Sequence, residues 1–125
     1  MVTGKAFESR PLETWREQLR RGALDLAILL SVSTARRRYG LDIIRHLEEF
    51  TDIVVGEGTI YPILARLTRE GVLVSEWINH EGPHPRKYYR LTDKGRSDLS
   101  EMIEHWKSFA AKLGRLVAAS GENVT

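Results

Sequence analysis

Histidine and cysteine are residues that often bind metal ions or act as nucleophiles, so their number and spacing indicate whether the chain could carry such chemistry. Four histidines are present and cysteine is absent, which removes disulfides, thiolate ligands and cysteine nucleophiles. His80 and His84 have the four-residue spacing of a helical metal pair, but Pro83 and the turn formers of 79–85 place them in a loop. The sequence has no nucleophile motif and no glycine-rich phosphate loop. It therefore predicts no metal, no cofactor and no catalytic residue, and it argues against an enzyme.

Arginine is the functional side chain that the composition favours. The chain has 125 residues and a formal net charge of +2, and 14 of its 19 basic residues are arginine. A guanidinium group makes forked hydrogen bonds with phosphate and with guanine, but arginine is also common on ordinary protein surfaces. The composition therefore permits nucleic-acid binding. Whether a given arginine contacts nucleic acid or only solvent depends on the residues around it.

The segment 59–70 has the pattern of a helix with an apolar side and a polar side. Apolar residues recur in it at helical spacing and predict a buried stripe. Opposite them stand side chains that can contact base edges, thymine methyl groups and phosphates. These are Thr59, Pro62, Arg66 and Arg69, flanked by Tyr61 and Ala65. In an isolated helix such a side is more often simply solvated, so the neighbouring elements must support the nucleic-acid interpretation.

A second group of cations lies in the predicted strand 86–91. Period-two alternation sends Lys87 to one face of this strand and Arg86 with Arg90 to the other. Beside a DNA-reading helix, such cations would follow phosphates or a minor groove. The alternative is the ordinary surface of an exposed hairpin, and the arginine cluster 36–38 has the same two interpretations.

The periodicity along the chain predicts the elements that would position these residues. We expect the order α-α-α-β-β-α, in helices over 11–31, 40–50 and 59–70, strands over 72–78 and 86–91, and a last helix over 93–118. Three helices followed by a hairpin are the plan of a winged helix-turn-helix, in which the later helix of the pair enters the major groove. The predicted fold is mainly α (α+β). The winged-helix DNA-binding domain covers 11–92, between flexible ends at 1–10 and 119–125.

The last predicted helix is longer than a domain of this size needs for its own core. Its 26 residues would span roughly 39 Å. A continuous apolar stripe follows it and predicts a dimer interface that also involves Trp15 of the first helix. The predicted interface residues are Trp15, Leu99, Met102, Ile103, Trp106, Phe109 and Leu113. We therefore expect a homodimer whose helix 93–118 is the dimerisation helix.

Short motifs occur along the chain in a specific order. They are Tyr39-Gly40 at the start of the second helix, 58–62 with Leu64, Arg66 and Leu67 in the third, Glu70-Gly71 at its end, 86–89 in the wing, and Leu91-Thr92 with Gly95 before the last helix. In this combination, over residues 20–118, the sequence resembles the PadR family of bacterial transcriptional regulators, in its short subtype with a single C-terminal helix. The resemblance implies a homodimeric repressor, a palindromic operator and, often, release by a small aromatic effector.

The resemblance also assigns roles to individual residues. Tyr39 and the wing cations would hold phosphates, while the helix 59–70 reads the groove. Trp106 stands where some effector-sensing relatives place a tryptophan that lines a pore at the dimer interface. Trp106 and Trp15 are therefore candidates for an effector site, and the other interpretation is that Trp106 only anchors the interface.

One alternative function remains compatible with the pattern. A winged-helix module could use the helix 59–70 and the hairpin to contact protein rather than DNA. The sequence shows neither a basic-then-apolar leader nor an unbroken apolar run long enough for a membrane span. We therefore expect a cytoplasmic, nucleoid-associated protein that contacts no membrane.

Overall fold

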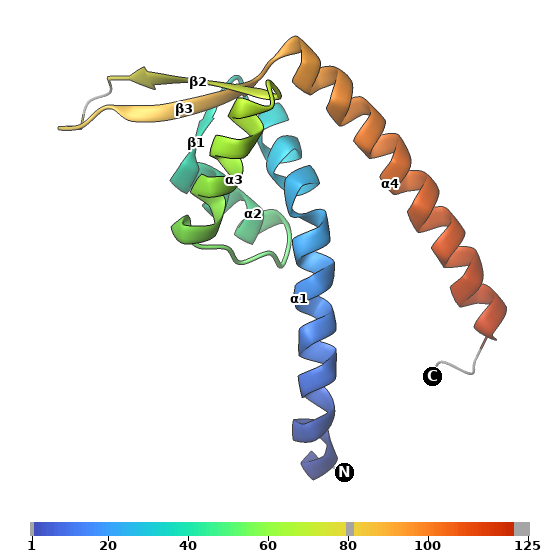
Figure 1. Ribbon diagram of the computed structural model, residues 1–125. Coiled ribbons are helices and arrows are strands. Elements are labelled where there is room, and N and C mark those ends of the chain that lie inside the picture. Colours follow the sequence, from blue (N-terminus) through green and yellow to red (C-terminus); the bar gives the residue numbers. More distant parts are fainter. Residues whose placement is uncertain (1, 80–81, 122–125) are drawn as a thin grey trace.

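The computed structural model describes residues 2–79 and 82–121 of the chain (Figure 1). Its elements are α1 (Val2–Ser33), β1 (Arg38–Tyr39), α2 (Gly40–Phe50), α3 (Glu57–Arg69), β2 (Leu73–Ile78), β3 (Arg86–Leu91) and α4 (Asp93–Ser120). The order of helices, hairpin and long last helix confirms the predicted winged helix-turn-helix. His80, one of the histidines considered above, lies outside the described residues.

The core forms where the second half of α1 meets α2, α3 and the base of the hairpin. Its side chains come from all of these elements and from the first turns of α4: Leu24, Ile28, Leu29, Val32, Ile43, Leu47, Ile60, Leu64, Leu67, Val72, Leu73, Tyr89, Leu91 and Leu99. Burying one such aliphatic side chain contributes about 1.5–3 kcal/mol. This burial fixes which side of each helix faces inward, and so which side of α3 is left for a partner.

The short strand β1 is an element that the sequence analysis did not predict. Arg38 and Tyr39 pair antiparallel with Tyr89 and Tyr88, which gives a three-stranded sheet in the order β1-β3-β2. Two residues are too few to show a period-two pattern. The strand exists because the chain between α1 and α2 runs along the free edge of β3.

Two glycines and a threonine join α3, the hairpin and α4. Gly71 has φ +80° and ends α3 in the left-handed conformation, as expected from its position. The Thr92 hydroxyl oxygen accepts a hydrogen bond from the Gly95 amide at 2.9 Å and donates to the Gly71 carbonyl at 2.6 Å. A Cβ atom on Gly95 would overlap the Val72 carbonyl, so only glycine lets α4 start this close to the strand.

Several helix boundaries differ from the prediction, most of all the start of α1. Helix α1 begins at Val2 rather than Pro11, so residues 2–10 continue the helix. Helix α4 extends to Ser120, and 122–125 lie outside the described residues. At the C-terminal end the added residues Ala119 and Ser120 need only local helix propensity, whereas the N-terminal continuation passes through Pro11, which the sequence pattern takes as a helix start.

Helix α3 also begins earlier than expected, at Glu57 with Gly56 as its N-cap. Pro62 therefore lies in the second turn of α3. Its missing N–H cannot bond to the Gly58 carbonyl. Gly58 is exposed, so water can satisfy that carbonyl, and the helix tolerates the proline.

Two long helices leave the body of the molecule. The N-terminal half of α1 and most of α4 extend on the side away from the wing and diverge from each other (Figure 1). None of the helices in the described part of the chain is both long and apolar enough to cross a membrane.

Candidate nucleic-acid interface

The outward side of α3 is defined by the residues that the core has taken. Ile60, Leu64 and Leu67 are buried, which leaves Pro62 and Arg69 on the opposite, exposed side of the helix. Tyr61 and Ala65 lie beside them and are also exposed. No hydrogen bond or ion pair engages the Arg69 guanidinium within the described residues. This side therefore presents the guanidinium of Arg69, the pyrrolidine ring of Pro62, the methyl group of Ala65 and the phenol of Tyr61.

Tyr61 is held in place by a close contact with the start of α2. A Cβ atom built on Gly40 would lie 2.5 Å from the Tyr61 hydroxyl oxygen, so the phenol ring rests directly on the glycine backbone. Partial burial, and then the charge of Glu57, raise the pKa of Tyr61 above its ordinary value. The phenol therefore stays protonated and can donate a hydrogen bond. Gly40 follows Tyr39, which pairs with β3, so the contact between Tyr61 and Gly40 lies next to the wing.

A groove separates α3 from the wing. Its volume is about 540 Å³, and it is lined by Tyr39, Gly40, Leu41, Tyr61, Ala65, Trp77, Pro85, Arg86, Lys87 and Tyr89. Five of the predicted DNA-binding residues line the groove or flank it on α3. The structure thus brings Tyr39, Tyr61, Arg86 and Lys87 together from three elements, with Pro62 next to them on α3.

The wing cations are ordered by aromatic rings. The Arg86 guanidinium lies 4.3 Å from the centre of the Tyr39 ring, and the Lys87 amine lies 5.7 Å from the centre of the Trp77 ring. Tyr39 meets Tyr88 edge to face with ring centres 5.3 Å apart. Such cation–π contacts fix a charge without neutralising it. Arg86 and Lys87 therefore remain available to an anionic partner.

Arg37 and Arg38, from the arginine cluster 36–38, lie in different environments. Arg37 lies 5.0 Å from the centre of the Tyr88 ring, which extends the row of stacked cations on the sheet. Arg38 is largely buried: it donates to the Ser31 carbonyl at 2.7 Å and to both Asp42 oxygens at 3.1 Å. Arg38 thus fastens the end of α1 to α2 and fixes the position of β1. Sequence reasoning treated the cluster as one unit, and only the register of β1 separates its members.

Arg66 is placed differently from the prediction that grouped it with Arg69. Its guanidinium donates to both Asp25 carboxylate oxygens, at 2.8 and 2.9 Å, and lies 3.4 Å from a Glu70 oxygen. The bond to Asp25, more than any other contact, raises the pKa of Arg66 above its ordinary value. The residue thus fastens α3 to α1 on the flank of α3 away from the wing. DNA contact by Arg66 stays a prediction, and it would require this ion pair to open.

Thr59 lies on the same flank as Arg66. It is exposed and borders a hollow between α1 and α3 that Asp25 and Val55 also line. The reason is angular: residues 59 and 66 are seven apart and share one stripe, while 62 and 69 share the next stripe round the helix. Of the four residues predicted to share one side, the structure therefore sets Pro62 and Arg69 opposite the core and turns Thr59 and Arg66 toward α1.

The predicted dimer residues fall into a buried set and an exposed set. Leu99 is in the core of its own subunit, and Met102 and Ile103 pack partly against that core. Because α4 leaves the body beyond this point, the remaining predicted residues are exposed by about half or more: Trp106 by 55%, Phe109 by 65%, Leu113 by 48% and Trp15 by 54%. The stripe on α4 therefore begins inside the subunit and continues onto an open apolar face.

Further exposed apolar residues lie on both arms of the subunit. Leu116 and Val117 extend the stripe to the end of α4, and Leu12 and Leu19 accompany Trp15 on α1. Trp15 and Trp106 are both exposed, on separate arms of the subunit. A second copy of the chain would offer matching apolar area for both arms.

Comparison with known proteins agrees with this architecture. The model of the Transcriptional regulator PadR-like family matches residues 28–101. A PadR family transcriptional regulator from Eggerthella lenta is 34% identical, with a TM-score of 0.76 over 90% of this chain and 96% of that one. A PadR-like regulator from Bacillus cereus is 32% identical, with a TM-score of 0.72 over 80% and 96% of the two chains. An uncharacterized protein from Lysinibacillus sphaericus is 31% identical over 73% of this chain and 84% of its own length.

Proposed function

Because the chain belongs to the PadR-like family of transcriptional regulators, we propose that it is a homodimeric repressor that binds a palindromic operator through α3 and the wing. Members of this family are DNA-binding regulators and not enzymes. One observation supports the choice of surface above all. The exposed side of α3 borders a groove whose other wall carries the uncompensated cations Arg86 and Lys87.

Each residue of this surface receives a role from its position. Arg69, Pro62 and Tyr61 lie on α3 and would face base edges in the major groove. Tyr39 with Arg86, and Lys87 on Trp77, would contact phosphates beside it. Thr59 and Arg66 would border the backbone on the side of α1, where Arg66 serves first to orient α3.

The dimer would form through the two projecting arms. The exposed stripe of α4 and the exposed apolar residues of α1 keep about half or more of their surface open to solvent, and a symmetric pair would cover both. A two-fold axis would then present two α3 helices to successive major grooves, roughly 34–36 Å apart. Such symmetry explains why the operator is proposed to be palindromic.

Effector control is the second part of the proposal. Trp106 and Trp15 belong to the proposed interface, so a small aromatic molecule bound between them would shift the spacing of the two α3 helices and favour a state that cannot bind DNA. Quenching of tryptophan fluorescence by planar aromatic compounds, and its loss in Trp106→Ala, tests this. If quenching persists in Trp106→Ala, Trp106 is only an interface anchor.

The DNA surface is tested with fragments selected from genomic DNA by the purified protein. Arg69→Ala is expected to cost about 1–3 kcal/mol of binding at one base position if Arg69 reads a base. Lys87→Ala should weaken binding to all sequences alike and flatten its dependence on salt. Arg115→Ala, far along α4, is the matched control. Operator affinity that is unchanged in both variants would favour the alternative, a winged-helix module that binds protein.

A further inference from the structure

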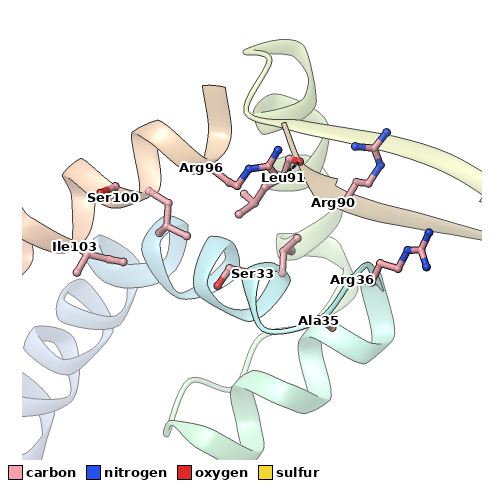
Figure 2. Close-up of a pocket in the computed structure, with 10 residues that line it drawn as sticks. Ser33, Ala35, Arg36, Arg90, Leu91, Arg96, Ser100 and Ile103 are labelled. Carbon is pink, nitrogen blue, oxygen red and sulfur yellow. Dashed lines mark hydrogen bonds between the residues drawn. The ribbon is translucent and has the colours of Figure 1, made fainter. Parts of the chain in front are cut away.

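A hollow lies at the junction of the winged-helix unit and α4, and none of the residues that line it belongs to α3. Its volume is about 640 Å³, in the range of small-molecule sites. It is bounded by the end of α1, by β3 and by the first turns of α4 (Figure 2). Arg90, on its rim, lies at the end of β3 that leads into α4, and the hollow shares no lining residue with the groove of the proposed DNA surface.

The floor of the hollow is aliphatic. Val32, Leu91 and Leu99 are all at least nine-tenths buried and belong to the core, and Ile103 completes the floor from α4. No aromatic side chain is among the residues that line it. A ligand with a flat ring would therefore find no stacking partner, whereas an alkyl chain would meet surfaces of its own kind.

The rim of the hollow is cationic. Arg36, from the loop after α1, and Arg90, from β3, lie at its wing end, and Ser100 and Ile103 lie at its α4 end (Figure 2). Neither Arg36 nor Arg90 has an acidic partner among the described residues. Arg96 also borders the hollow and is held by Asp93 and by the Leu91 carbonyl, so one guanidinium of the three is already compensated.

From these features we infer that the hollow binds an amphiphilic carboxylate with an aliphatic body. The alkyl chain would lie on Val32, Leu99 and Ile103, and the carboxylate would accept hydrogen bonds from Arg36 and Arg90. Charge-assisted, forked bonds of this kind are the strongest that an arginine makes. The site touches both the winged-helix unit and α4, and it is distinct from the aromatic effector site proposed at Trp106.

Calorimetric titration of the full-length protein with octanoate tests the assignment, with 1-octanol as the uncharged analogue. We expect octanoate to bind at micromolar to millimolar concentration, and octanol at least about tenfold more weakly. Arg36→Gln and Arg90→Gln should each weaken octanoate binding by about two- to fivefold, since the two side chains are solvent-exposed. Ser100→Phe, which places a ring at the edge of the hollow, should abolish binding.

Matched variants separate this site from other apolar surfaces. Ser97→Phe adds the same ring to an exposed position of α4 that does not line the hollow, and it should bind octanoate like the wild type. Trp106→Ala should also leave octanoate binding unchanged. The assignment is overturned if octanoate does not bind, if octanol binds equally well, if Ser100→Phe binds normally while keeping the wild-type circular dichroism, or if Trp106→Ala abolishes binding.

Discussion

Replacing Asp25 with alanine removes the carboxylate that holds Arg66 against α1. Both side chains of this ion pair are slightly more than one-third exposed, at 38% and 39%, so solvent screens the attraction. Exposed pairs contribute about 0.2–1 kcal/mol, and the short distances of 2.8 and 2.9 Å from Arg66 Nη2 to the two Asp25 oxygens favour the upper end of that range. We therefore expect Asp25→Ala to lower the free energy of unfolding by about 1 kcal/mol. For a chain of this size that corresponds to a melting temperature lower by about 4 °C.

Arg66→Ala should cost slightly more, because it also removes the contact with Glu70, worth about 0.3–0.5 kcal/mol as a helical pair. Urea unfolding of the two single variants and of the double variant measures the coupling free energy, which we expect to be close to 1 kcal/mol. Arg16→Ala, which breaks only an exposed pair with Glu13, is the control and should stay within about 0.5 kcal/mol of the wild type.

Operator binding separates an orienting role of Arg66 from base reading. If Arg66 mainly orients α3, Asp25→Ala and Arg66→Ala should weaken operator binding by similar factors, about threefold or less. If Arg66 reads a base, Arg66→Ala alone should lose about tenfold or more at one base position. A coupling free energy near zero, together with a large operator defect confined to Arg66→Ala, would refute the reasoning from the ion pair.

Three further predictions concern other parts of the molecule. Gly40→Ala should destabilise the fold by about 1–3 kcal/mol, because its methyl group overlaps the Tyr61 ring, and Tyr61→Ala in the same chain should restore much of this loss in thermal unfolding. Trp106→Asp and Phe109→Asp should each convert the proposed dimer to a monomer in analytical ultracentrifugation while keeping the helical circular dichroism. Burial raises the pKa values of Tyr61 and Tyr89 above 10, so their stabilising effect is complete below pH 10 and is lost as the pH rises through the folded-state values. Ultraviolet titration should show late phenol ionisation that Tyr89→Phe reduces.

Each of these has an outcome that would contradict it. Equal melting temperatures for Gly40→Ala and the wild type would mean that Tyr61 does not rest on α2 in solution. A dimer that persists in Trp106→Asp and Phe109→Asp would place the interface elsewhere. An ultraviolet titration that is the same in the native protein and in urea would mean that neither phenol is shielded.

Much of the fold follows from local patterns in the sequence. The stripe of Ile60, Leu64 and Leu67 predicts which side of α3 faces the core, because apolar residues at helical spacing fall on one side of a helix and that side becomes buried. Thr92 and Gly71 mark helix ends through hydrogen bonds and backbone angles that act within a few residues. The family motifs around Tyr39-Gly40 and 86–89 combine such local requirements, and they identified the family.

What the sequence did not determine is the partner of each charged or aromatic side chain. Arg66 and Arg69 are three residues apart on one helix, yet only Arg66 comes within reach of Asp25, 41 positions earlier. Likewise Leu99 and Trp106 share one stripe of α4, but the core takes the first and leaves the second exposed. The ion pair of Arg66 and the burial of Leu99 depend on how α1 and α4 are placed against the rest of the winged-helix domain. That arrangement is set by packing between distant segments, which the spacing of residues along one helix does not encode.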